Sequence, residues 1–325
     1  MLRTSRLGLA AALAAVFAAP PVRASEPDKL LPAETDSVVY INVKQVIESD
    51  IVKKYALEQM KQALQGNDAQ KFLADLGLDP LKDVDKVVIG GSGKDQTDMK
   101  FLAILHGKFD PEKLYKAAEA QTKKDGDHFT LVKDGKDVMF KYQPDNGNPV
   151  YGTVVDDTTV VLGNEKKTIT TALAAATAKT VVIGKDLAGL VAKMDDKASM
   201  WAVSVVKGKL DNVKIPAGGP GPNLQGQLAG LESIVAVVRV TADVNLDVTL
   251  GMKDADAADE MGKSVKELVD TIKGALPFLA AQKPELKPLV EAGKSLKSDV
   301  KEKSVVLTAK LPGNAIGQLL KQGGD

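Results

Sequence analysis

Four segments of this sequence have similar counterparts, in the same order, later in the chain, which favours folds built from two similar halves. The paired segments are 37–43 with 199–205, 85–91 with 232–238, 101–114 with 246–259, and 160–176 with 305–320. Within the third pair we align the glycines, so that Gly107 corresponds to Gly251 and Asp110 to Asp254. The repetition of strand-like and helix-like patterns in this order predicts a duplicated module.

The strand-like segments alternate between apolar and polar residues. In VNLDVTLGM, Leu246, Val248 and Leu250 alternate with polar residues, as in an antiparallel sheet with one covered face. Hairpin turns are expected at Asp134-Gly135, Asn146-Gly147 and Asp156-Asp157. We therefore predict an α+β protein, a duplicated two-layer module in which helices pack on one face of an antiparallel sheet.

Acidic caps mark the expected helix starts. Asp110 precedes Pro111, and Asp254 occupies the matching position of the second half. A long helical segment is expected at about 255–298, with interruptions at Pro277, Pro284 and Pro288. Its inward stripe is predicted to be Met261, Val265, Leu268 and Ile272.

The first 24 residues have the pattern of an export signal. Arg3 and Arg6 precede an unbroken apolar run of 13 residues, and Ala24 is suited to signal peptidase. The run is short for a membrane span of about 20 residues, and an uncleaved N-terminal anchor is the alternative. We predict cleavage between Ala24 and Ser25, export to the periplasm or the extracellular space, and no stable membrane insertion of the mature chain.

The mature chain is expected to divide near Ala178–Lys185. The first α+β module is 25–180 and the second is 181–325. The junction is short and does not have the composition of a linker, so the two modules could also share one continuous sheet.

The composition argues against several classes of function. The chain has no cysteine, which removes thiol catalysis and cysteine-bound metal centres. Its 43 basic and 43 acidic residues balance, and Arg239 is the only arginine after the predicted cleavage, so no nucleic-acid-binding surface is indicated. Aromatic residues make up 4%, too few to favour platforms that stack bases or sugars.

One resemblance can be named. The segments LGLDPLKDVDKVVIGG (76–91) and KFLAILHGKFDPEKLYKAAE (100–119), with LPAETDSVVYINV (31–43) upstream, resemble families of exported bacterial proteins built from duplicated α+β modules. The likeness extends over most of the mature chain. It implies a signal peptide and a location outside the cytoplasm, and it brings no catalytic motif and no activity.

Two motifs resemble ligand-binding loops, but each departs from the required pattern. In IGGSGKD (89–95), a phosphate-binding loop would need glycine in place of Val88 and serine or threonine in place of Asp95. In DADAAD (254–259), a calcium loop would need glycine in place of Asp259 and glutamate in place of Val265. We interpret the first as a hairpin loop and the second as the acidic first turn of a helix.

The chain has two histidines, His106 and His128. His106 corresponds to Leu250 in the repeat, so we interpret it as a mostly buried, paired imidazole that leucine could replace without loss of stability. His128 lies in the turn KKDGDHFT and is expected to be exposed. Neither has a nucleophile or a carboxylate at the spacing of a known motif.

Other candidates have structural interpretations. The carboxylate pairs Asp83/Asp85, Asp125/Asp127, Asp156/Asp157 and Asp195/Asp196 suit solvated turns better than a hydrolase site. Trp201 is expected to anchor the core. The Gly- and Pro-rich segment 217–227 has the composition of either a partner-docking element or an ordinary loop.

Taken as a set, these patterns predict no catalytic, cofactor-binding or metal-binding residues, and therefore no enzyme. We expect an exported binding or structural protein of the cell envelope or secretome, with a protein or an apolar ligand as partner. Two alternatives stay open: a carrier of an apolar ligand between sheet and helices, and a hydrolase that uses the turn carboxylates.

Overall fold

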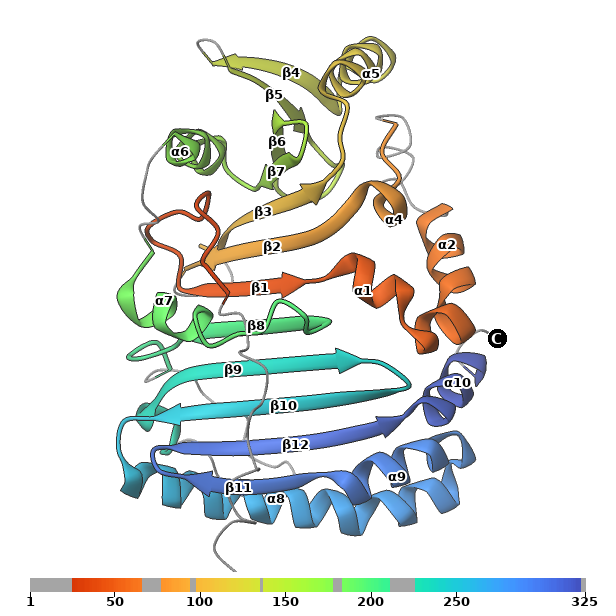
Figure 1. Cartoon of the computed structure of the whole chain (residues 1–325), viewed down its shortest axis with the longest axis vertical. Helices are drawn as coiled ribbons and strands as arrows, with labels where there is room; N and C mark the ends of the chain where they lie inside the picture. Colours follow the sequence, from red (N-terminus) through yellow and green to blue (C-terminus); the bar gives the residue numbers. More distant parts are fainter. Residues whose placement is uncertain are drawn as a thin grey trace, which may run out of the picture.

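The computed structural model describes residues 25–65, 77–93, 98–134, 137–177, 183–210 and 226–322. Its twelve strands form one open antiparallel sheet (Figure 1). In chain order the strands are β1 (Ser37–Ile41), β2 (Val84–Ser92), β3 (Lys100–Gly107), β4 (Phe129–Asp134), β5 (Asp137–Tyr142), β6 (Val150–Asp156), β7 (Thr159–Gly163), β8 (Met200–Val205), β9 (Leu231–Val240), β10 (Asp243–Met252), β11 (Lys297–Lys301) and β12 (Ser304–Pro312). The predicted α+β class and antiparallel sheet are confirmed.

The two halves of the chain meet in the middle of this sheet. β1 and β8 pair antiparallel, with Tyr40 opposite Trp201. The order across the sheet is β11-β12-β10-β9-β8-β1-β2-β3-β7-β6-β5-β4. Outward from β1, the neighbouring strands are β2, β3, β7 and β6, and outward from β8 they are β9, β10, β12 and β11. On both sides, two consecutive strands are therefore followed by a hairpin whose second strand lies on the inside. Both halves therefore share one continuous sheet.

The helices connect these strands. They are α1 (Val43–Glu48), α2 (Leu57–Gln65), α4 (Pro80–Asp83), α5 (Pro111–Lys124), α6 (Lys166–Ala176), α7 (Lys185–Val191), α8 (Ala255–Gln282), α9 (Lys287–Ser295) and α10 (Gly313–Gln322). A π-helical stretch, Val52–Ala56, joins α1 to α2, and 3-10 turns form at Leu228–Gly230 and Pro284–Leu286.

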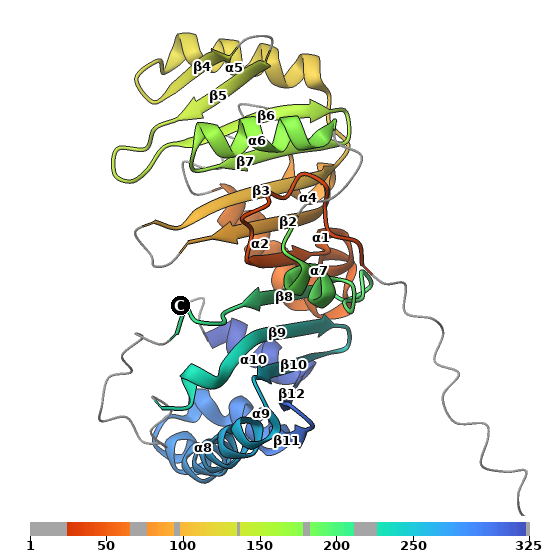
Figure 2. The same ribbon diagram turned by 90° about the vertical axis from the view of Figure 1, so that its left-hand side faces the viewer.

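Helices cover both faces of the sheet, which corrects the prediction of a single covered face. Successive residues of a strand point to opposite faces. Ile104 packs in a cluster with residues of α6 and α7, whereas Leu105 packs with α5. Leu250 packs with α8, and Figure 2 shows α7 and α8 on opposite sides of the sheet. The central strands carry apolar residues in consecutive positions, such as Val87 and Val88, so both of their faces need a cover.

Residues 25–36, here called the N-terminal strap, lie across the face that α6 and α7 also cover. Leu30 and Leu31 are each 2% exposed. Leu31 lies directly over Gly90, where an added Cβ would be 2.6 Å from Leu31 Cδ2. In the motif IGGSGKD, Gly90 thus makes room for the strap. Residues 94–97 of the motif region lie outside the described residues.

The predicted helix caps are confirmed, but the predicted interruption at Pro277 is wrong, and the helical segment ends at Ser295 instead of at about 298. Asp110 accepts a hydrogen bond from the Lys113 N–H, and Asp254 accepts one from the Ala257 N–H. α8 continues through Pro277, which removes only one hydrogen bond from a helix that packs on the sheet. Residues 297–301 form β11, because Ser298 and Val300 alternate with charged residues at the period of a strand.

Candidate functional site

His106 joins the sheet to the N-terminal strap. It lies on β3, and its Nε2–H donates to Asp28 Oδ2 at 2.6 Å. The two side chains are 23% and 11% exposed. His106 does not take the position expected from Leu250: it faces the strap, whereas Leu250 faces the helix that follows its strand, as Leu105 does. No sequence pattern indicated Asp28 as the partner of His106, because Asp28 lies 78 residues earlier in the chain.

The carboxyl group of Asp28 is held in its charged form. Burial raises its pKa, but hydrogen bonds from His106 and from the Leu30 N–H outweigh burial and lower the pKa below the usual 3.8. Lys86 contributes a further favourable charge. The strap is therefore attached to the sheet through an ionised, largely buried acid whose partners come from both elements.

An aromatic pair lies beside this contact, at the junction of the two halves. Tyr40 and Trp201 stack across the β1–β8 pair, with ring centroids 5.1 Å apart and planes 10° from parallel. The Tyr40 hydroxyl and Asn42 Nδ2 both donate to the backbone carbonyl of Asp196 at 3.1 Å. Burial, and then the charges of Asp196 and Asp195, raise the pKa of Tyr40 to about 12. Trp201 is 3% exposed, which confirms its predicted place in the core.

A small cavity of about 40 Å³ lies under the strap next to this pair. Its walls include Ser25, Asp28, Lys86, Asp196 and Trp201. The buried Trp201 Nε1–H has no hydrogen-bond partner among the described residues. A polar cavity of this size can hold ordered water, whereas pockets for small molecules measure about 300–1,000 Å³.

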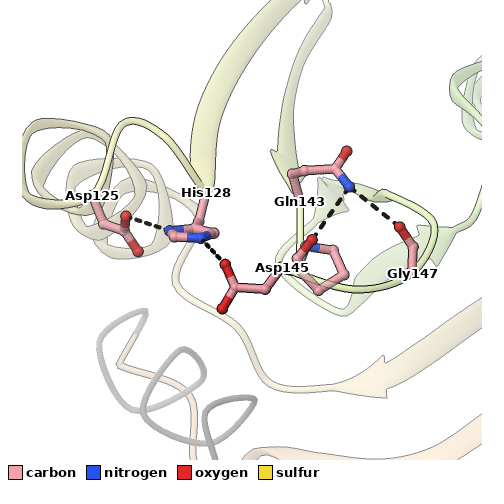
Figure 3. A network of polar contacts seen from close by, with 6 residues as sticks. Asp125, His128, Gln143, Asp145 and Gly147 are labelled. Atoms are coloured by element: carbon pink, nitrogen blue, oxygen red, sulfur yellow. Dashed lines mark hydrogen bonds and ion pairs between the residues drawn. The ribbon is translucent and has the colours of Figure 1, made fainter.

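His128 lies between two carboxylates (Figure 3). Its Nδ1–H donates to Asp125 at 2.9 Å, and its Nε2–H donates to Asp145 at 2.8 Å. The hydrogen bond to Asp125, and then the one to Asp145, raise the pKa of His128 to about 9. Gln143 holds the same loop by donating to the Gly147 carbonyl at 3.3 Å. With this pKa both ring nitrogens are protonated donors at neutral pH, which is the wrong protonation state for a general base.

Three of the eight acidic candidates accept hydrogen bonds from nearby backbone groups. Asp156 accepts from the N–H of Thr158 at 2.9 Å and from its hydroxyl at 2.7 Å. Burial raises the pKa of Asp156, but the hydrogen bonds from Thr158 lower it overall. Asp195 accepts from the Lys197 N–H and Asp83 from the Asp79 N–H. These are the contacts of turns, and the lowered pKa of Asp156 is the opposite of what a general acid needs.

The remaining candidates do not come together. Asp256 and Asp259 lie in the first turns of α8, and residues 217–225 of the Gly- and Pro-rich segment lie outside the described residues. Within the described ranges, no group of three histidine, cysteine or carboxylate side chains could hold a metal. No helix of the described chain is both long and apolar enough to cross a bilayer.

The candidate site is thus the junction under the strap, formed by Asp28, His106, Tyr40 and Trp201. It combines one hydrogen-bonded histidine–carboxylate pair, one stacked aromatic pair and a water-sized cavity. No family model, no curated protein and no solved structure matches this chain.

Proposed function

We propose that this chain is an exported protein, cleaved between Ala24 and Ser25, that acts by binding or as a structural component of the envelope or secretome. The observation that carries this proposal is the position of Ser25, the first residue after the expected cleavage site. Ser25 is 5% exposed, and its N–H donates to the Met194 carbonyl at 3.2 Å. A mature chain that starts at Ser25 would have its first residue built into the fold.

The proposed architecture is a duplication of an α+β module, with copies at 25–180 and 181–325. Two features support it. The strands are added in the same sequence on both sides of the β1–β8 pair. In addition, Asp110 and Asp254 cap the helices that follow β3 and β10 through the same kind of contact, to the N–H three residues on.

The geometry gives less support to the two alternatives. For a carrier, the cavity under the strap is too small, and a larger hollow of about 480 Å³ is lined by polar residues, including Lys44, Gln45, Glu48 and Asp50. For a hydrolase, Asp156 and Asp195 are engaged by backbone groups of their own turns. A structural or protein-binding role is the function that this fold supports best.

The experiment is to express the full chain in a bacterium and measure the intact mass of the protein in each fraction. We expect the exported fraction to begin at Ser25. Ala24→Tyr is the matched variant, because a large residue at the cleavage site should block processing. Recovery of intact chain with Met1 from the membrane fraction would contradict the proposal. A stoichiometric apolar molecule that co-purifies with the mature protein would favour the carrier.

A further inference from the structure

The second half of α8 is apolar but largely uncovered. Residues 271–282, TIKGALPFLAAQ, contain one charged residue, whereas residues 255–270 of the same helix contain seven. Phe278 is 66% exposed, Leu279 is 42% exposed and Ile272 is 37% exposed. Large apolar side chains that gather in this way on a surface mark an interaction site more often than single exposed ones do.

The exposure follows from the length of the helix. Met261 and Val265, at the start of the predicted inward stripe, are 2% and 4% exposed, but Ile272 at its end is not covered. α8 has 28 residues and β12 has nine, so the helix is about 42 Å long and the strand about 31 Å. α9 covers only one side of the remainder, where Gly293 meets Leu276. Figure 1 shows α8 at one end of the molecule, beside the edge strand β11.

Positive charge follows the apolar stretch. Lys283 and Lys287 are exposed and form no ion pair with any described side chain, whereas Lys266 and Lys294, on either side of them, pair with Asp270 and Glu291. Glu285 is the only acidic residue between 271 and 290. The exposed apolar side chains of α8 are therefore followed by two lysines that have no ion-pair partner among the described residues.

We propose that this surface, Ile272–Leu279 with Lys283 and Lys287, docks reversibly on a membrane surface that contains anionic lipid. Helices that lie in the membrane interface combine large apolar side chains with lysines that reach the headgroups. Lysine is depleted in the interfaces of protein complexes, which favours a lipid surface over a second copy of the chain. The inference deepens the proposed envelope role by naming what the protein binds.

Pro277 adds to this argument. A proline inside a helix cannot donate to the carbonyl four residues earlier, so the Lys273 carbonyl lacks its helical partner. In a dry protein interface an unpaired carbonyl would be costly, but water and headgroups are available at the surface of a bilayer.

The test is a co-sedimentation assay with the purified mature chain. Its vesicles are made of phosphatidylcholine and about 30% phosphatidylglycerol, which is an anionic lipid. We expect the wild-type chain to bind these vesicles, to bind pure phosphatidylcholine at least about tenfold more weakly, and to be released as salt screens the lysines. Phe278→Ser should weaken binding about tenfold. Met99→Ser is the matched control, because Met99 is 50% exposed but lies outside α8.

Three outcomes would overturn the proposal. The first is no binding to the anionic vesicles, and the second is an equal loss of binding in both variants. The third is a chain that does not bind vesicles but forms a dimer in solution, which Phe278→Ser dissociates. Because Phe278 is mostly exposed, its variant should unfold at the wild-type temperature, and a melting curve checks this. The assay starts from chain that already begins at Ser25, so its result does not depend on whether cleavage occurs at that residue in cells.

Discussion

The two histidines make the same kind of contact in opposite surroundings. His106 and Asp28 are largely buried and join segments 78 residues apart. His128 is 38% exposed and binds Asp125, three residues away, and Asp145 in the next loop. Removing His106 from the buried pair leaves a carboxylate that water can reach only in part, whereas the carboxylates around His128 can be fully rehydrated. The surroundings of a contact, more than its chemistry, decide how much stability depends on it.

The largest effect is expected from His106→Leu. The variant leaves the Asp28 carboxylate buried without its main partner, which should lower the free energy of unfolding by about 2–3 kcal/mol. This reverses the expectation from the repeat that leucine would be tolerated, because that expectation did not include Asp28. Urea unfolding at pH 7 measures the effect, and the double variant with Asp28→Asn should recover part of it. A stability equal to that of the wild type would show that the pair does not hold the strap.

The second prediction concerns acid. The pKa of Asp28 in the folded protein lies below its usual 3.8. The contribution of Asp28 to the free energy of unfolding is therefore full above pH 3.8 and is lost as the pH falls through the lowered pKa of the folded state. The difference in unfolding free energy between the wild type and Asp28→Asn, measured by urea unfolding, should be full at pH 5 and should shrink as the pH falls below 3.8. A difference that grows as the pH falls below 5 would mean that the pKa of Asp28 is raised and that Asp28 is not held ionised.

The third prediction places the contribution of His128 at the other end of the pH scale. The pKa of His128 is raised from 6.5 to about 9. Its contribution to the free energy of unfolding is therefore full below pH 6.5 and is lost as the pH rises through 9. The free energy of unfolding of His128→Gln should therefore differ most from that of the wild type at pH 6 and least at pH 10, as measured by urea unfolding. The effect should be smaller than that of His106→Leu and should weaken in salt, because the ring is partly exposed. Asp28→Asn serves as the control, since its effect should not change between pH 8 and pH 10.

The local features of this fold were predictable from the sequence, and the contacts between distant segments were not. Asp110 and Asp254 were identified as caps because a cap is recognised from the residues beside it. No neighbouring residue identifies the role of Asp28, because its partner His106 comes close only when the strap lies across the sheet. Ile272 fits the periodic stripe, but the stripe cannot tell where the sheet beneath the helix ends. The place of Trp201 in the core could be predicted from the strand pattern around it. Its stacking on Tyr40 could not, because that contact depends on how β1 and β8 pair.

The smallest effect separates the two carboxylates around His128. Asp145 is 85% exposed and Asp125 is 40% exposed, so the charge of Asp145 is better screened by water. Asp125 is also the larger cause of the raised pKa of His128. Asp125→Asn should therefore lower the pKa of His128 more than Asp145→Asn does, with little change in unfolding temperature for the second variant. An NMR titration of the His128 ring measures both shifts, and His106 in the same spectra is an internal control. A larger shift in Asp145→Asn would mean that the exposed loop, and not the end of α5, holds the ring in place.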